Sequence, residues 1–232
     1  MNKTESYKMN AQIAGILWLL AIVAGIIGVG FLGNYQDIET NIALFSQNET
    51  SILIAVLLIL VMCFSTANIA IFLYPVLKKY NESMALSSVG FRLLETVCFI
   101  IGALGFFLLF VVSNEYVNAG SPSDTSYQLL IHTFLNLHEI SSSIAGFALN
   151  AGAFMYCYIF FRTKLVPRGV GALGIIAVSL GMLDSFLSFF GFYAGFASIS
   201  VVLSLPTLLF EIIIALWLIV KGFNQEALSS LT

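Results

Sequence analysis

The sequence predicts an all-α integral membrane protein, a polytopic bundle of six transmembrane helices. Hydrophobic residues make up 59% of the 232 residues and charged residues only 9%, whereas a soluble domain carries about 25% charged residues. The mean hydropathy is +1.00, so the chain has too little polar surface to fold in water. Six long apolar runs provide the spans, because about 20 helical residues cross a hydrocarbon core about 30 Å thick.

The first two spans are predicted at residues 11–32 and 51–77. The first run is interpreted as a retained helix, since the apolar part of a signal peptide is only about 7–15 residues long. The segment between the two runs contains three acidic residues and no basic one, which is typical of an outer loop. The second run ends at YPVLKKY, whose two lysines indicate a return to the cytoplasm.

The other four spans are predicted at residues 86–112, 127–161, 169–192 and 198–220. The fourth run is too long for one upright span, so the core of that span is placed at residues 140–161. A tight loop with Gly195 joins the last two spans. Because the chain has no linker or low-complexity segment, residues 1–232 are predicted to form a single transmembrane domain.

The basic residues predict the orientation of the bundle. Lys and Arg in short loops stay on the cytoplasmic side, and eight of the nine fall at one face of the six-helix arrangement. These eight are Lys3, Lys8, Lys78, Lys79, Arg162, Lys164, Arg168 and Lys221. Both termini are therefore predicted to be cytoplasmic, with the acidic loops outside.

The ninth basic residue, Arg92, lies inside the third span, in the segment VGFRLLE. Arg92 and Glu95 are three residues apart and share a helix face, and a charge at this depth is costly. At 1.5 Å per residue from the nearest lysines, Glu211 and Asn68 each lie about 15 Å deep, at a similar level. These four residues are expected to converge as an inner polar cluster. Pro206, which removes a backbone donor, predicts a kink just before Glu211.

Two interpretations of the inner polar cluster stay open. In the first, a buried ion-pair network holds three helices in register, with Arg92 shared between Glu95 and Glu211. In the second, the excess of acids over bases leaves one carboxyl that exchanges a proton or binds a cationic substrate. A change of Glu211 to Gln separates the two, because only the second makes an activity depend on that carboxyl.

A second set of polar residues is expected towards the outside, and we call it the outer polar cluster. It consists of His138, Glu139, Asp184 and Asn150. Its atom types suit a metal, but the spacing matches no established motif, so no metal is predicted. Helix capping, interface anchoring or a hydrogen-bond network at a pore mouth is the favoured role.

The remaining motifs do not indicate an enzyme. The sequence has no glycine-rich phosphate loop and no GxSxG elbow, so no catalytic residue and no cofactor are predicted. A chain without a basic soluble surface is not expected to bind nucleic acid. The expected partners are the lipid bilayer and a small molecule or ion.

Three segments resemble a bacterial membrane protein family described as domain of unknown function 4386. The segments are YPVLKKYNESMALSSVGFRLLE, LVPRGVGALGIIAVSLGMLDSF and PTLLFEIIIALWLIVKGF, and the resemblance runs from the first helix to Phe223. Recurring family positions fall here on Arg92, Glu95, His138, Pro167, Arg168, Asp184, Ser185 and Glu211, with Val166 in place of a leucine. The resemblance implies a six-helix protein of the bacterial cytoplasmic membrane and brings no established activity.

Three functions are compatible with these features. In the first, the charges organise the bundle of a structural, sensor or scaffold protein. The second is a small proton- or ion-coupled transporter that uses Glu211, Glu95 and Asp184, and it requires a water-accessible path from Glu211 to Asp184. The third is an intramembrane enzyme acting on lipid, which depends on the His138, Glu139 and Asp184 side chains.

Overall fold

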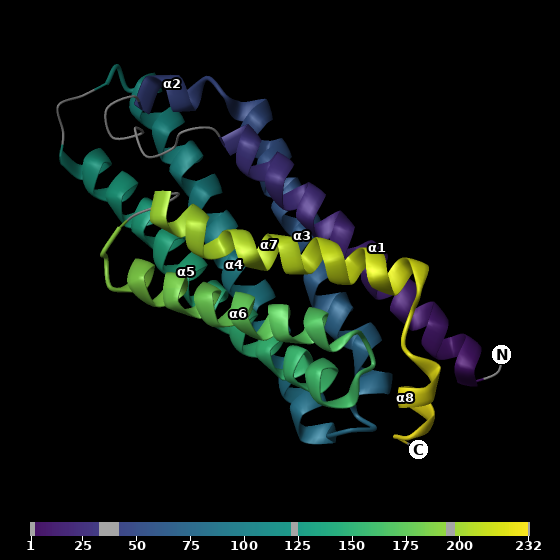
Figure 1. The fold of residues 1–232 in the computed structure, drawn as a ribbon. Coiled ribbons are helices and arrows are strands. Elements are labelled where there is room, and N and C mark those ends of the chain that lie inside the picture. The colour runs from purple at the N-terminus through teal and green to yellow at the C-terminus, as the bar shows by residue number, and fades with distance from the viewer. Residues whose placement is uncertain (1–2, 33–41, 122–124, 194–197, 232) are drawn as a thin grey trace.

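The structure, a computed structural model, describes residues 3–32, 42–121, 125–193 and 198–231. Within these ranges the chain is helical and contains no strand (Figure 1). Six helices are long and apolar enough to cross a membrane: α1 (Lys3–Leu32), α3 (Glu49–Leu77), α4 (Glu82–Asn118), α5 (Thr125–Thr163), α6 (Arg168–Phe189) and α7 (Ser198–Val220). Two short helices, α2 (Ile42–Ser46) and α8 (Gln225–Ser229), accompany them. The prediction of an all-α, six-helix membrane protein is confirmed.

The ends of several helices differ from the predicted spans. At 1.5 Å per residue, the 39 residues of α5 measure about 58 Å, so this helix extends well beyond a hydrocarbon core about 30 Å thick. Helix α4 starts earlier than predicted, because the side chain of Asn81 accepts a hydrogen bond from the Met84 N–H and caps it. Helix α6 ends at Phe189 instead of residue 192, because Gly191 adopts a φ of +72° that terminates the helix.

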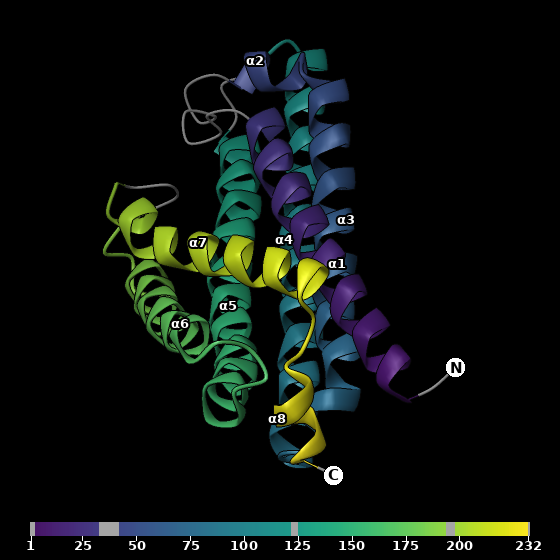
Figure 2. The ribbon, with the colours of Figure 1, turned by 45° about the vertical axis from the view of Figure 1, so that its right-hand side comes forward.

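Helices α1, α3, α4 and α5 form the long part of the bundle, and α6 and α7 pack on its side. Figure 2 shows α7 crossing in front of α5 and α4, and α7 packs on α6 and on α1. Helix α7 runs without interruption through Pro206, and next to that proline the Thr207 hydroxyl donates to the Ala177 carbonyl of α6, 3.2 Å away. The expected kink at Pro206 stays a prediction. Both termini lie at one end of the bundle (Figure 1).

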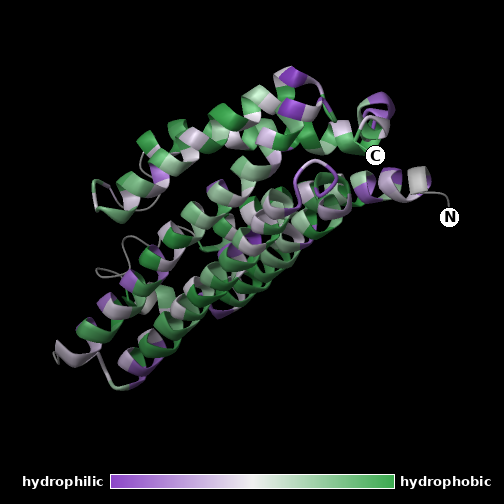
Figure 3. Ribbon diagram, turned by 90° about the horizontal axis from the view of Figure 1, so that it is seen from below, coloured by the Kyte–Doolittle hydropathy of each residue, from purple (hydrophilic) through white to green (hydrophobic). Residues whose placement is uncertain are grey.

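The outer surface of the helices is apolar. Figure 3 shows hydrophobic residues along the helices and hydrophilic residues gathered near their ends and in the connecting loops. The most exposed large apolar side chains include Ile26, Leu57, Phe64, Val202 and Val220. A surface of this kind suits contact with hydrocarbon, where the helix backbone satisfies its own hydrogen bonds.

The described residues form two separate hydrophobic core clusters in the interior. The first surrounds Trp18, Phe160 and Phe210 near the end where the termini lie. The second surrounds Phe106 and Leu109 towards the opposite end. On α4 the first cluster includes Ala85 and the second begins at Ala103. Arg92 and Glu95 therefore occupy the junction between the two cores.

Candidate functional site

Arg92 and Glu95 form a buried ion pair on one face of α4. Both residues are 0% exposed. The Arg92 Nη1 donates to both carboxylate oxygens of Glu95, at 2.9 and 3.2 Å. The sequence predicted this pairing from the three-residue spacing, and the close contact offsets part of the cost of burying each charge.

Tyr156 connects this ion pair to α5. The Arg92 Nη2 donates to the Tyr156 hydroxyl oxygen at 2.6 Å, and the guanidinium carbon lies 5.6 Å from the centre of the Tyr156 ring. The same ring meets Trp18 of α1 edge-on, with 5.6 Å between ring centres. One aromatic residue thus links α4 to both α5 and α1. We call Arg92, Glu95 and Tyr156 the Arg92 network.

Helix α3 joins the Arg92 network through threonines. The Thr96 hydroxyl of α4 lies 2.9 Å from the Arg92 carbonyl and 3.2 Å from the Cys63 carbonyl of α3. The Thr66 hydroxyl donates to the same Cys63 carbonyl at 3.0 Å, and the Thr66 side chain also interacts with the Glu95 carboxyl. Neither threonine stood out in the sequence, because a buried threonine commonly bonds within its own helix.

Asn68 does not belong to the cluster in which the sequence placed it. Its side-chain amide donates to the Phe64 carbonyl one turn earlier on α3, at 2.7 Å. Asn68 lies two residues beyond Thr66, which corresponds to about 200° around an α-helix. Since Thr66 faces Glu95, Asn68 points away from it, although the two α3 residues lie at nearly the same depth.

Glu211 of α7 lies near the Arg92 network but is not bonded to Arg92. Its charge interacts with Arg92, Glu95 and Tyr156, and its carboxyl lies beside the Trp18 indole. Among the described residues, the ion pair of Arg92 is with Glu95, so the expected sharing of Arg92 by two carboxylates is wrong. The Tyr156 hydroxyl, and not the Glu211 carboxyl, accepts the hydrogen bond of the Arg92 Nη2. Glu211 remains a half-buried carboxyl with no direct cationic partner in the described part of the chain.

The members of the outer polar cluster face different neighbours. The His138 Nδ1 lies 3.1 Å from the Gly102 carbonyl of α4, and its ring packs edge-on against Phe106. The Asp184 carboxylate accepts a hydrogen bond from the Tyr193 hydroxyl, and burial together with this bond raises the pKa of Tyr193 to about 12. The half-buried Glu139 accepts a bond from Ser143 at its backbone carbonyl. His138 and Asp184 are thus not brought together by the described contacts.

Within the described residues, no group of three His, Cys, Asp or Glu side chains has a geometry that could hold a metal ion. The hypothesis of an enzyme acting on lipid required His138, Glu139 and Asp184 to share one site. The described contacts of His138 and Asp184 do not support such a site.

Asn150 lies in the contact between α5 and α6. It is 4% exposed, and its amide nitrogen donates to the Gly146 carbonyl at 2.8 Å. Its side-chain oxygen is buried and has no hydrogen-bond partner among the residues that the structure describes. A Cβ atom placed on Gly181 of α6 would come within 2.5 Å of that oxygen. A Cβ on Gly146 would meet the Ser185 hydroxyl at 2.4 Å. Small residues thus let the two backbones approach closely.

Comparison with known protein families found a match to one family model. A family model described as Domain of unknown function (DUF4386) matches residues 13–222. No curated protein and no solved structure matches the chain. The match includes the Arg92 network, Glu211 and the α5–α6 contact.

Proposed function

Since the chain belongs to the family described as domain of unknown function 4386, whose description names no activity, we propose its function from the geometry of the buried polar residues. We propose a structural, sensor or scaffold protein of the bacterial cytoplasmic membrane, with the lipid bilayer as its immediate partner. In this protein the hydrogen bonds of the Arg92 network hold the helices in register.

One observation carries this proposal: the bonds of the buried guanidinium are made within the bundle and connect separate helices. Arg92 binds Glu95 on its own helix and Tyr156 on α5, at the junction of the two hydrophobic cores. Such a group stabilises one arrangement of the helices, because any shift that separates Arg92 from its acceptors leaves a charge buried and unpaired.

A proton- or ion-coupled transporter is the second candidate, and Glu211 favours it. A half-buried carboxyl without a direct cationic partner is a group that can take up a proton or a cation. The close α5–α6 contact at Gly146 and Gly181 supports the structural role over transport, because it leaves little room for a water path between those helices towards Asp184.

Glu211→Gln tests the two candidates. The substitution keeps the size of the side chain and removes its charge. The structural role predicts that proton flux into proteoliposomes, followed with a pH-sensitive dye inside the vesicles, equals that of empty vesicles for both wild type and variant. A flux that the wild type supports and a folded Glu211→Gln variant loses would establish transport instead. Glu49→Gln, an exposed change at the start of α3, is the matched control.

A further inference from the structure

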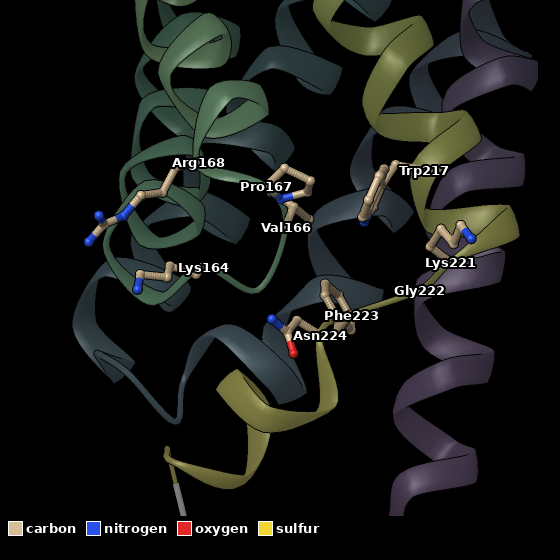
Figure 4. Close-up of a pocket in the computed structure, with 9 residues that line it drawn as sticks. All are labelled: Lys164, Val166, Pro167, Arg168, Trp217, Lys221, Gly222, Phe223 and Asn224. Carbon is tan, nitrogen blue, oxygen red and sulfur yellow. The ribbon is translucent and has the colours of Figure 1, made fainter.

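A cleft of about 600 Å³ opens at the end of the bundle where both termini lie. It is formed by the α5–α6 loop, the start of α6, the last turn of α7 and the segment before α8 (Figure 4). Its lining consists of Lys164, Val166, Pro167, Arg168, Trp217, Lys221, Gly222, Phe223 and Asn224. The volume is within the range of about 300–1,000 Å³ that is usual for small-molecule sites.

The cleft combines an apolar interior with a cationic rim. Val166 and Phe223 are buried side chains of the first core cluster. Lys164, Arg168 and Lys221 are exposed, and Figure 4 shows the first two on one side of the cleft and Lys221 on the other. None of the described residues that line the cleft is a carboxylate. Among the described residues none of these three cations is paired with an acid, so the rim is complementary to an anion.

Trp217 provides a hydrogen-bond donor without an acceptor. Its Nε1 is buried and has no partner in the described part of the chain, and Figure 4 places its ring across the cleft from Pro167 and Val166. A buried N–H without an acceptor is destabilising, and a turn of the indole into the cleft would let a ligand oxygen accept its hydrogen bond. Helix α6 begins at Arg168, so its N-terminus, where negative charge is stabilised, also lies at the rim.

The cleft is next to the lipid-facing surface of α7. Leu216 and Val220, which flank Trp217 on the last turns of α7, are 49% and 71% exposed. Tryptophan is enriched where a helix passes from hydrocarbon to water, and basic side chains near that boundary attract anionic lipids. A ligand with both an apolar part and an anionic head fits this position.

We propose that this cleft binds an anionic phospholipid. The phosphate oxygens accept a hydrogen bond from Trp217 Nε1 once the indole has turned into the cleft. The Lys164, Arg168 and Lys221 side chains, whose charged ends point outward in Figure 4, turn towards the head group. The glycerol region lies over Val166 and Phe223, while the acyl chains follow the exposed face of α7. This binding is independent of the role proposed for the Arg92 network.

The experiment measures lipid binding to the full chain, purified in a neutral detergent. Phosphatidylglycerol, phosphatidylcholine and inorganic phosphate are added separately. Thermal unfolding and the number of retained lipids, counted by native mass spectrometry, are recorded. We expect phosphatidylglycerol to be retained and to raise the unfolding temperature, with little effect of the other two. Equal stabilisation by phosphatidylcholine, or by phosphate alone, would overturn the proposal.

Two variants place the binding in the cleft. A cation near a charged lipid contributes about 1 kcal/mol, or about fivefold in affinity, so the triple variant Lys164→Gln/Arg168→Gln/Lys221→Gln should weaken phosphatidylglycerol binding about 100-fold. Trp217→Phe keeps a ring and removes the donor, which should weaken it about tenfold. Because the three cations are exposed, the triple variant tests the proposal even if Trp217→Phe does not fold.

The matched control removes the same charge elsewhere on the same end of the bundle. Lys78, Lys79 and Arg162 lie outside the lining of the cleft. The triple change Lys78→Gln/Lys79→Gln/Arg162→Gln should leave phosphatidylglycerol binding within about threefold of wild type. An equal loss in both triple variants would show that only the overall charge of this end attracts the lipid, and would overturn a defined site.

Discussion

Arg92 is the residue on which the polar interior depends most. A fully buried guanidinium needs acceptors for its donors, and the structure provides the Glu95 carboxylate and the Tyr156 hydroxyl. Its Nε has no partner among the described residues. The hydrogen bonds of Nη1 and Nη2 therefore offset the cost of burying this charge. Substitutions of the residues that accept these bonds should destabilise the protein.

Glu95→Gln should lower the stability of the folded bundle by about 3–5 kcal/mol, because it leaves the Arg92 charge buried without a counter-charge. The double change Arg92→Met/Glu95→Met should recover much of this loss, since apolar residues of similar volume replace a buried ion pair with little penalty. Thermal unfolding in detergent measures both. A double variant less stable than Glu95→Gln would contradict the explanation that the unpaired Arg92 charge causes the loss of stability.

Tyr156→Phe should cost about 1–2 kcal/mol, because it removes the acceptor of the Arg92 Nη2 while keeping the ring that packs on Trp18. The control is Tyr158→Phe on the same helix, where the ring stacks on Phe154. Equal unfolding temperatures of the two variants would show that the hydroxyl does not stabilise the network.

Helices α5 and α6 lie so close together that a Cβ atom on Gly146 or Gly181 would overlap a side chain of the other helix. Gly146 and Gly181 lie opposite Ser185 and Asn150, so each helix offers a space that the other fills. Helix α7 reaches the bundle through α6 and α1. The position of Glu211 relative to Arg92 therefore depends on how closely α6 lies against α5.

Gly181→Ala should destabilise the protein by about 1–3 kcal/mol, because its Cβ would overlap the buried Asn150 side chain. In an Asn150→Ala background the same change should cost little, since the obstructing atoms are gone. Gly90→Ala is the control, because a Cβ on Gly90 meets nothing within 4 Å. Chemical unfolding of the wild type, Gly181→Ala, Asn150→Ala and the double variant gives a double-mutant cycle. If the two changes have additive effects on the free energy of unfolding, this contact is refuted.

The C-terminal segment packs against the end of the helix bundle where the termini lie. Phe223 and Leu228 belong to the first core cluster, and the Asn224 N–H donates to the Leu165 carbonyl of the α5–α6 loop at 2.9 Å. This segment also forms one wall of the cleft. The first core cluster thus extends beyond the transmembrane helices.

Phe223→Ala should destabilise the folded protein by about 3–5 kcal/mol, the range for removing a buried aromatic side chain, because Phe223 is 2% exposed. Val220→Ala, three residues away on the lipid-facing surface and 71% exposed, should change the stability by less than about 1 kcal/mol. Limited proteolysis of the C-terminal segment provides the second readout. Protection equal to wild type in Phe223→Ala would contradict this packing.

The sequence by itself determined the features that depend on local counts of residues. The lengths of the apolar runs defined six helices, and a three-residue spacing placed Arg92 and Glu95 on one face. The depth of a residue follows from its distance along the helix to a charged anchor, and this placed Glu211 near the same level. Each is a property of one segment, so no knowledge of its neighbours was needed.

Only the tertiary structure decided which way each helix faces. Thr66 and Asn68 lie at nearly the same depth, but about 200° apart around α3, and packing turns Thr66 towards Glu95. The same rotation brings Tyr156 to Arg92 in place of Glu211 and directs His138 and Asp184 to different neighbours. Helix rotation is set by how small and large side chains fit across helix contacts, and those contacts join residues far apart in the sequence.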